Sequence, residues 1–136
     1  MRVQDASRSR KTPSPARFRK WVAASAAGPT EVTVRLVSAA EGRRLNLAYR
    51  GKDYATNVLT FTYDSGLGDI VLCSPVIARE ARAQGKTLDE HFAHLTVHAM
   101  LHLRGYDHER KGDAGRMERA EIRILSGLGY PNPYLA

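Results

Sequence analysis

The stretch His98-Ala99-Met100-Leu101-His102-Leu103-Arg104-Gly105-Tyr106-Asp107-His108 contains three histidines with the spacing H-x3-H-x5-H. On a helix, His98 and His102 share one face with Cβ atoms about 5–6 Å apart, so both rings can reach one metal ion at about 2.0–2.1 Å. Gly105 can adopt the left-handed conformation that ends a helix, which lets the chain turn back and offer His108 as a third ligand. Three protein ligands and one open position are typical of a catalytic zinc, so we predict one Zn²⁺ per chain.

The same helix contains further histidines, and spacing alone therefore leaves the choice of ligands open. His91, His94, His98 and His102 follow one helical stripe with spacings of 3, 4 and 4. His94 and His98 form a second i, i+4 pair, and a stripe of histidines can also be a solvated face. The pair 98/102 is favoured because it is followed by a glycine and by a third histidine.

The spacing also occurs in the metzincin protease signature H-E-x-x-H-x-x-G-x-x-H. Position 99 is Ala99 here, where those proteases have the glutamate that acts as general base. The metal-binding pattern is thus present without the usual base of a peptidase. A metalloprotease-like hydrolase stays an alternative, because a base can come from another part of the chain.

The composition is that of an ordinary globular domain. The chain has 136 residues, of which 43% are apolar and 26% charged, so one domain with its own core is expected. Cys73 is the only cysteine, so we expect no disulfide partner and a reducing, cytoplasmic location. No apolar run approaches the roughly 20 residues of a membrane span, and we expect no membrane partner.

The positive charge is concentrated near the N-terminus. The net charge is +7, and residues 1–20 contain seven Lys and Arg against one Asp. We expect residues 1–15 to form a basic, flexible arm, which either binds nucleic acid by counterion release or is a solvated tail. Residues 16–136 are expected to form the single zinc-binding domain.

Periodicity and breakers predict a single small α+β domain, with a mixed sheet of three or four strands packed with four or five helices. Thr87 and Glu90 form a capping box that begins the histidine helix, which should end near Gly105. Alternating apolar residues predict the strands, and helical periodicity with glycine and proline stops predicts the other helices. The strands are expected at 31–37, 56–63 and 69–73, and the other helices at 17–27, 39–50, 75–84 and 113–126.

Three blocks, in the same order along the chain, resemble one known family. Residues 98–108 are similar to H-G-x-L-H-L-x-G-Y-D-H, residues 46–61 to N-x-x-Y-R-x-K-D-x-x-T-N-V-L-S-F, and residues 67–71 to a block with L-G-D-I. These are signatures of the YbeY family of bacterial endoribonucleases that mature ribosomal RNA. Ala99 stands where the family usually has glycine. The family's first strand has no clear apolar counterpart within residues 1–12.

The resemblance implies a zincin-like core and a zinc-dependent, single-strand-specific endoribonuclease in ribosomal RNA maturation and ribosome quality control. It implies that His98, His102 and His108 bind the zinc and that Arg50 is catalytic. It also implies ribosomal RNA, ribosomal subunits and ribosome-associated proteins as partners. A further alternative is a zinc-stabilised ribosome-binding factor with little catalysis of its own.

The residues themselves support two interpretations of Arg50. A guanidinium can make a bidentate contact to a phosphate, but it can equally form a surface salt bridge, here with Asp53 or Asp69. Tyr49 and Tyr106 are expected to be packing residues.

Overall fold

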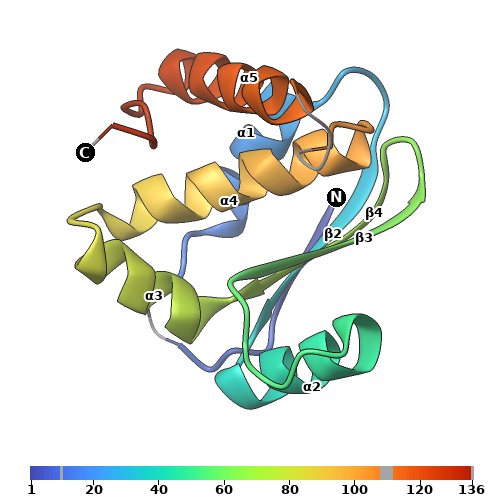
Figure 1. The fold of residues 1–136 in the computed structure, drawn as a ribbon, viewed down its shortest axis with the longest axis vertical. Helices are drawn as coiled ribbons and strands as arrows, with labels where there is room; N and C mark the ends of the chain where they lie inside the picture. Colours follow the sequence, from blue (N-terminus) through green and yellow to red (C-terminus); the bar gives the residue numbers. More distant parts are fainter. Residues whose placement is uncertain (10, 108–111, 136) are drawn as a thin grey trace.

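The structure is a computed structural model that describes residues 1–9, 11–107 and 112–135. These residues form one α+β domain with four strands and five helices (Figure 1). The elements are β1 (Arg2–Asp5), α1 (Pro15–Ser25), β2 (Glu31–Val37), α2 (Ala39–Arg50), β3 (Val58–Asp64), β4 (Leu67–Cys73), α3 (Ser74–Ala83), α4 (Leu88–Leu103) and α5 (Asp113–Gly127). The predicted fold class is confirmed, and the predicted elements are present with ends shifted by no more than two residues.

The sheet is mixed and has the strand order β1-β2-β4-β3. β1, β2 and β4 are parallel, whereas β3 is antiparallel to β4. A tight turn joins β3 to β4, and Gly66 in this turn has a φ of 74°, a conformation that glycine adopts without steric cost. Because β3 is the last strand in the order, it is an edge strand, and it lies beside α4, the helix that contains the histidines.

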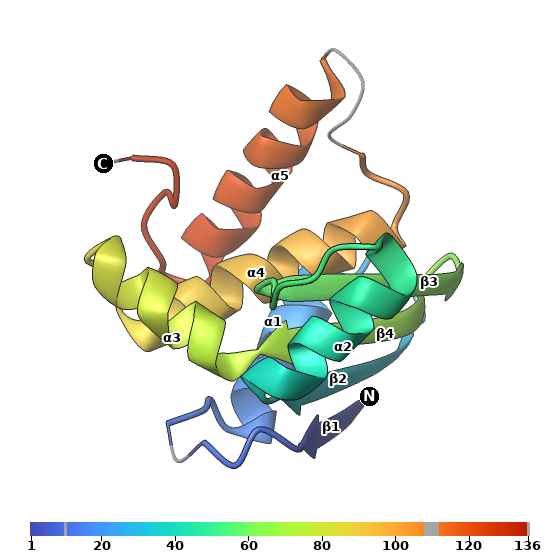
Figure 2. The same ribbon diagram turned by 60° about the horizontal axis from the view of Figure 1, so that its bottom comes forward.

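The helices cover the two faces of the sheet differently (Figure 2). On one face, Val34 of β2 and Ile70 of β4 belong to the main core, which they share with α1, α4 and α5. On the other face, Leu59 and Val71 belong to a smaller cluster against which Leu45 of α2 packs. α2 covers only part of this second face, because a hollow lined by Leu45, Phe61 and Val71 remains beside it.

β1 was not predicted from the sequence. Arg2–Asp5 pairs in parallel with β2, from Arg2 opposite Thr33 to Asp5 opposite Leu36, within the segment expected to be a flexible arm. Val3 is the one apolar residue of this strand, and it packs against the main core. The alternation that predicts a strand is missing, because backbone pairing at the sheet edge rather than side-chain burial positions it.

α4 is the central helix of the main layer. Its N-terminus is capped as predicted, since the Thr87 hydroxyl accepts the backbone N–H of Glu90 at 3.1 Å. Gly105 has a φ of 95° just after the helix ends, as predicted for a helix stop. No helix in the described part of the chain is long and apolar enough to cross a membrane.

Candidate metal centre and cleft

α4 is buried on most of its circumference, and three of its four histidines occupy the remaining, partly exposed stripe. The apolar residues around Phe92 and Met100 are fully buried, because the helix lies between the sheet and two other helices. His94, His98 and His102 are only partly buried. The apolar faces of the helix are buried in the core, and three imidazoles therefore lie along its one partly exposed face.

The rings of His98 and His102 face each other through their Nε2 atoms, which are 3.2 Å apart. Each Nδ1 atom faces an acceptor: that of His98 lies 2.7 Å from Oε1 of Glu121, and that of His102 lies 3.1 Å from the carbonyl oxygen of Tyr106. These acceptors favour a proton on each Nδ1, which leaves the Nε2 lone pairs directed toward one another.

This arrangement fits a metal ion. Two nitrogens bound to one tetrahedral zinc at about 2.0–2.1 Å are roughly 3.3 Å apart, close to the observed separation of the His98 and His102 Nε2 atoms. Metal-binding histidines usually donate their other N–H to a carboxylate or a carbonyl, as both rings do here. The two described nitrogens therefore fit a zinc ion in spacing and in the orientation of their rings.

The third predicted ligand, His108, lies outside the described residues. Among the residues that the structure does describe, no group of three or more potential metal ligands is found. The structure thus brings two of the three predicted ligands together, with Gly105 at the turn that leads toward the third.

The alternative ligand pair, His94 with His98, has a different geometry. Nε2 of His94 lies 2.7 Å from Oε2 of Glu121, so this ring faces the carboxylate. The ring centroids of His94 and His98 are 6.4 Å apart, whereas those of His98 and His102 are 4.7 Å apart. His91 is buried and interacts with Glu80 at 2.8 Å. The geometry favours the pair 98/102.

Glu121 of α5 is the site residue that the sequence analysis missed. Its side chain is only 1% exposed, and its carboxylate also accepts the hydroxyl of Tyr134 at 2.5 Å. Burial alone raises the pKa of Glu121, but hydrogen bonds with His94, His98 and Tyr134 outweigh it and lower the pKa to about 2. The sequence signal was a glutamate on the apolar face of an amphipathic helix.

Arg50 lies in the same cleft as the histidine pair. A cavity of about 700 Å³ is lined by the end of α2, by the edge strand β3 and by His98 and His102. The two carboxylates considered as salt-bridge partners of Arg50 interact elsewhere: Asp53 with Arg43 at 2.6 Å, and Asp69 with the hydroxyl of Tyr63 at 2.7 Å. Within the described residues, no ion pair of Arg50 is found, and its side chain is exposed.

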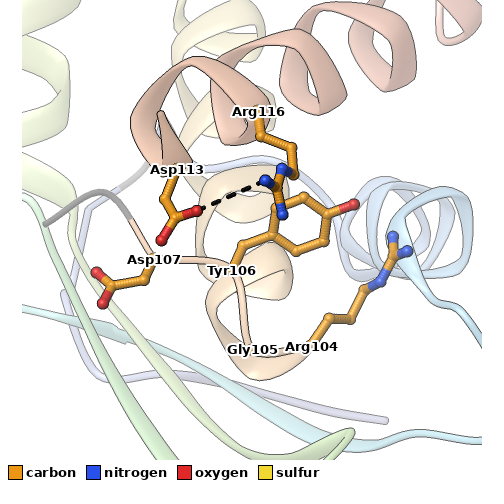
Figure 3. Close-up of a pocket in the computed structure, with 6 residues that line it drawn as sticks. All are labelled: Arg104, Gly105, Tyr106, Asp107, Asp113 and Arg116. Atoms are coloured by element: carbon orange, nitrogen blue, oxygen red, sulfur yellow. Dashed lines mark ion pairs between the residues drawn. The ribbon is translucent and has the colours of Figure 1, made fainter. Parts of the chain in front are cut away.

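A second hollow of about 630 Å³ lies beyond the C-terminus of α4 (Figure 3). Its charged groups largely satisfy each other or the backbone. Arg116 is 3.9 Å from Asp113, and Arg104 donates to the carbonyl of Ser25 while lying over the ring of Tyr106. The histidine pair does not line this hollow, so the candidate site is the cleft at β3.

Known proteins similar to this chain agree with the sequence blocks. The family model for Endoribonuclease YbeY matches residues 6–129. The chain is 61% identical to the endoribonuclease YbeY of Aromatoleum aromaticum, over 91% of this chain and 82% of the relative. It is 51% identical to that of Nitrosomonas eutropha, over 99% and 98%. Its fold is similar to the solution structure of TM1509 from Thermotoga maritima, with a TM-score of 0.59 and 23% identity over 98% and 99% of the two chains.

Proposed function

Because the chain belongs to the YbeY family of endoribonucleases, we propose that it is a zinc-dependent endoribonuclease that cuts single-stranded segments of ribosomal RNA in the cytoplasm. Its partners are then ribosomal subunits and the proteins associated with them. The observation that carries the proposal is the shared cleft, in which a facing histidine pair and Arg50 line one cavity.

The metal-binding residues in this proposal are His98, His102 and His108, with one Zn²⁺ per chain. Zinc, when bound, supplies charge stabilisation at a phosphoryl oxygen. The protein contributes the orientation of the rings. Glu121 holds His98 and the carbonyl of Tyr106 holds His102, so that both Nε2 atoms stay directed into the cleft.

Arg50 has the role of binding the scissile phosphate. Its planar guanidinium donates two parallel hydrogen bonds to phosphate oxygens, a geometry that the point charge of lysine does not reproduce. Its exposure beside the histidine pair supports this role. The negative charge that develops on the phosphate in the transition state strengthens the same contacts, and this differential binding accelerates the reaction.

A peptidase is less well supported by the site. Ala99 occupies the position of the protease glutamate, and its side chain is fully buried in the main core. Alanine has no group that can accept a proton, so this position supplies no general base.

The proposal is tested by product analysis with single-stranded RNA and with casein. We expect cleavage of the RNA only, and we expect Arg50→Lys to retain the fold and zinc but to lose most of the cleavage rate. Arg44→Lys is the matched control, since Arg44 is an exposed arginine of the same helix that does not line the cleft. Unimpaired cleavage by Arg50→Lys would remove Arg50 from the mechanism, and digestion of casein alone would favour a protease.

A further inference from the structure

Three aromatic side chains lie beside the cleft, and two of them are largely exposed. Tyr49 was expected to be a packing residue, yet its side chain is 67% exposed, and that of Tyr63 is 65% exposed. Phe61 is partly buried and its ring meets that of Tyr49 edge to face, with centroids 5.0 Å apart. We name Tyr49, Phe61 and Tyr63 the aromatic shelf.

The rings of the shelf are held in place although they face water. Tyr49 is supported by the ring of Phe61, and the hydroxyl of Tyr63 donates to Asp69 at 2.7 Å. A large aromatic surface that is ordered but exposed is unfavourable for the isolated protein, and aromatic residues in such positions are enriched where a ligand is bound.

The shelf is continuous with the cleft. Tyr49 and Phe61 line the cavity that contains Arg50 and the histidine pair, and they also line a hollow of about 350 Å³ on the face of the sheet that α2 leaves open. Tyr63 lies in this second hollow. A chain whose phosphate lies at Arg50 therefore meets the aromatic rings as it leaves the histidines.

The charges around the shelf suit a polyanion more than an apolar partner. Arg50 at the end of α2 and Lys52 just after it are exposed. Three carboxylates lie nearby: Glu41 is held by Arg35 at 2.8 Å, Asp53 by Arg43 at 2.6 Å, and Asp69 accepts the hydroxyl of Tyr63 at 2.7 Å. Cationic side chains next to exposed aromatic rings are the usual combination at sites that bind single-stranded nucleic acid.

We propose that the aromatic shelf stacks unpaired bases of the RNA strand next to the scissile phosphate. The inference rests on the proposed function and deepens it, because it gives the preference for single strands a physical origin. The bases of a duplex stack on each other and pair with the opposite strand, so their faces are not available to Tyr49 and Tyr63.

The test is binding of a fluorescein-labelled, 2′-O-methyl single-stranded 12-mer to the zinc-loaded full chain, measured by fluorescence anisotropy with the intact probe verified on a gel. We expect Tyr49→Ala and Tyr63→Ala each to weaken binding about 5- to 150-fold, the loss that corresponds to about 1–3 kcal/mol per stacked base. Tyr49→Phe keeps the ring and should stay within about twofold of the wild type, since stacking does not need the hydroxyl.

The matched control is Tyr54→Ala, because the side chain of Tyr54 is also 54% exposed but lines neither hollow. It should leave binding unchanged. A duplex of the same sequence should bind more weakly to the wild type, and the two shelf variants should not weaken it further.

The outcomes separate this inference from the proposed function. Unchanged binding of the 12-mer in Tyr49→Ala and Tyr63→Ala would overturn the shelf, even if the wild type cleaves RNA. Weakened binding in a protein that cleaves no RNA would support the shelf and refute the nuclease. An equal loss in Tyr54→Ala would also overturn the shelf, because the effect would then be general to exposed tyrosines.

Discussion

Replacing Glu121 by glutamine tests how the protein orients the proposed metal ligand His98. One oxygen of the carboxylate faces Nδ1 of His98 at 2.7 Å, and the other faces both His94 and the hydroxyl of Tyr134. A glutamine has the same shape but only one oxygen acceptor. If that oxygen serves the two groups on one side, the NH₂ group faces His98.

An amide donor next to Nδ1 of His98 favours the tautomer with the proton on Nε2, the atom that should bind the metal. Changes to groups that orient a metal ligand typically cost 10- to 100-fold in affinity. We therefore expect Glu121→Gln to bind zinc about 10- to 100-fold more weakly, which corresponds to about 1.4–2.7 kcal/mol.

The assay is competition for zinc with a chromophoric chelator, on protein whose circular dichroism shows the native fold. Glu118→Gln is the matched control, because Glu118 is an exposed carboxylate on the same helix. Tyr134→Phe leaves the bond to His98 in place and should have a smaller effect than Glu121→Gln. Wild-type zinc affinity in a folded Glu121→Gln variant would refute the reasoning.

Three further predictions concern stability and RNA binding. A Cβ atom on Gly68 would lie 2.3 Å from the carbonyl oxygen of Phe61 and 2.6 Å from Leu103, so denaturant titration should show Gly68→Ala to be less stable by at least about 2 kcal/mol. The control Gly127→Ala, with no atom near its Cβ position, should be neutral or up to about 1 kcal/mol more stable. Unchanged stability of Gly68→Ala would mean that the strands can separate without cost. Because the pKa of Glu121 is lowered from 4.5 to about 2, the ionised carboxylate contributes about 3 kcal/mol to the free energy of unfolding above pH 4.5, and this contribution is lost as the pH falls toward 2. Denaturant titrations over this pH range should therefore show a flatter pH dependence of stability in Glu121→Gln than in the wild type. Identical curves would contradict the lowered pKa. Replacing Arg8, Arg10 and Lys11 by glutamine should make the salt dependence of RNA binding weaker without changing the cleavage position. The slope of the logarithm of the RNA binding constant against the logarithm of the salt concentration should change by at most about 2, at about 0.7 for each phosphate contact. An unchanged slope would show that these residues do not contact RNA.

The central helix was predictable because its signals are local. The cap at Thr87, the histidine spacing and the stop at Gly105 each depend on residues within a few positions of one another. The same holds for the face shared by His98 and His102, and the structure brings these two rings together. The third ligand, His108, stays a prediction.

The missed features depend on contacts between distant segments. Glu121 was visible as a glutamate on an apolar face, but its histidine partners lie on another helix, 23 and 27 residues earlier in the chain. β1 is held by pairing with β2, which its own composition does not indicate. Tyr49 is exposed because it lies in the last turn of α2, beside the edge strand β3. The sequence of a helix does not indicate where along its length the helix stops packing on the sheet.

The most direct test of the account is cleavage of a defined ribosomal RNA precursor by the wild-type protein and by His102→Ala, with the zinc content of both measured on the same samples. We predict one zinc per wild-type chain and cuts within single-stranded segments. We also predict that folded His102→Ala loses the zinc and at least about 100-fold in cleavage rate, as removal of one of three ligands empties a catalytic site. Cleavage at the wild-type rate by zinc-free His102→Ala would contradict the account.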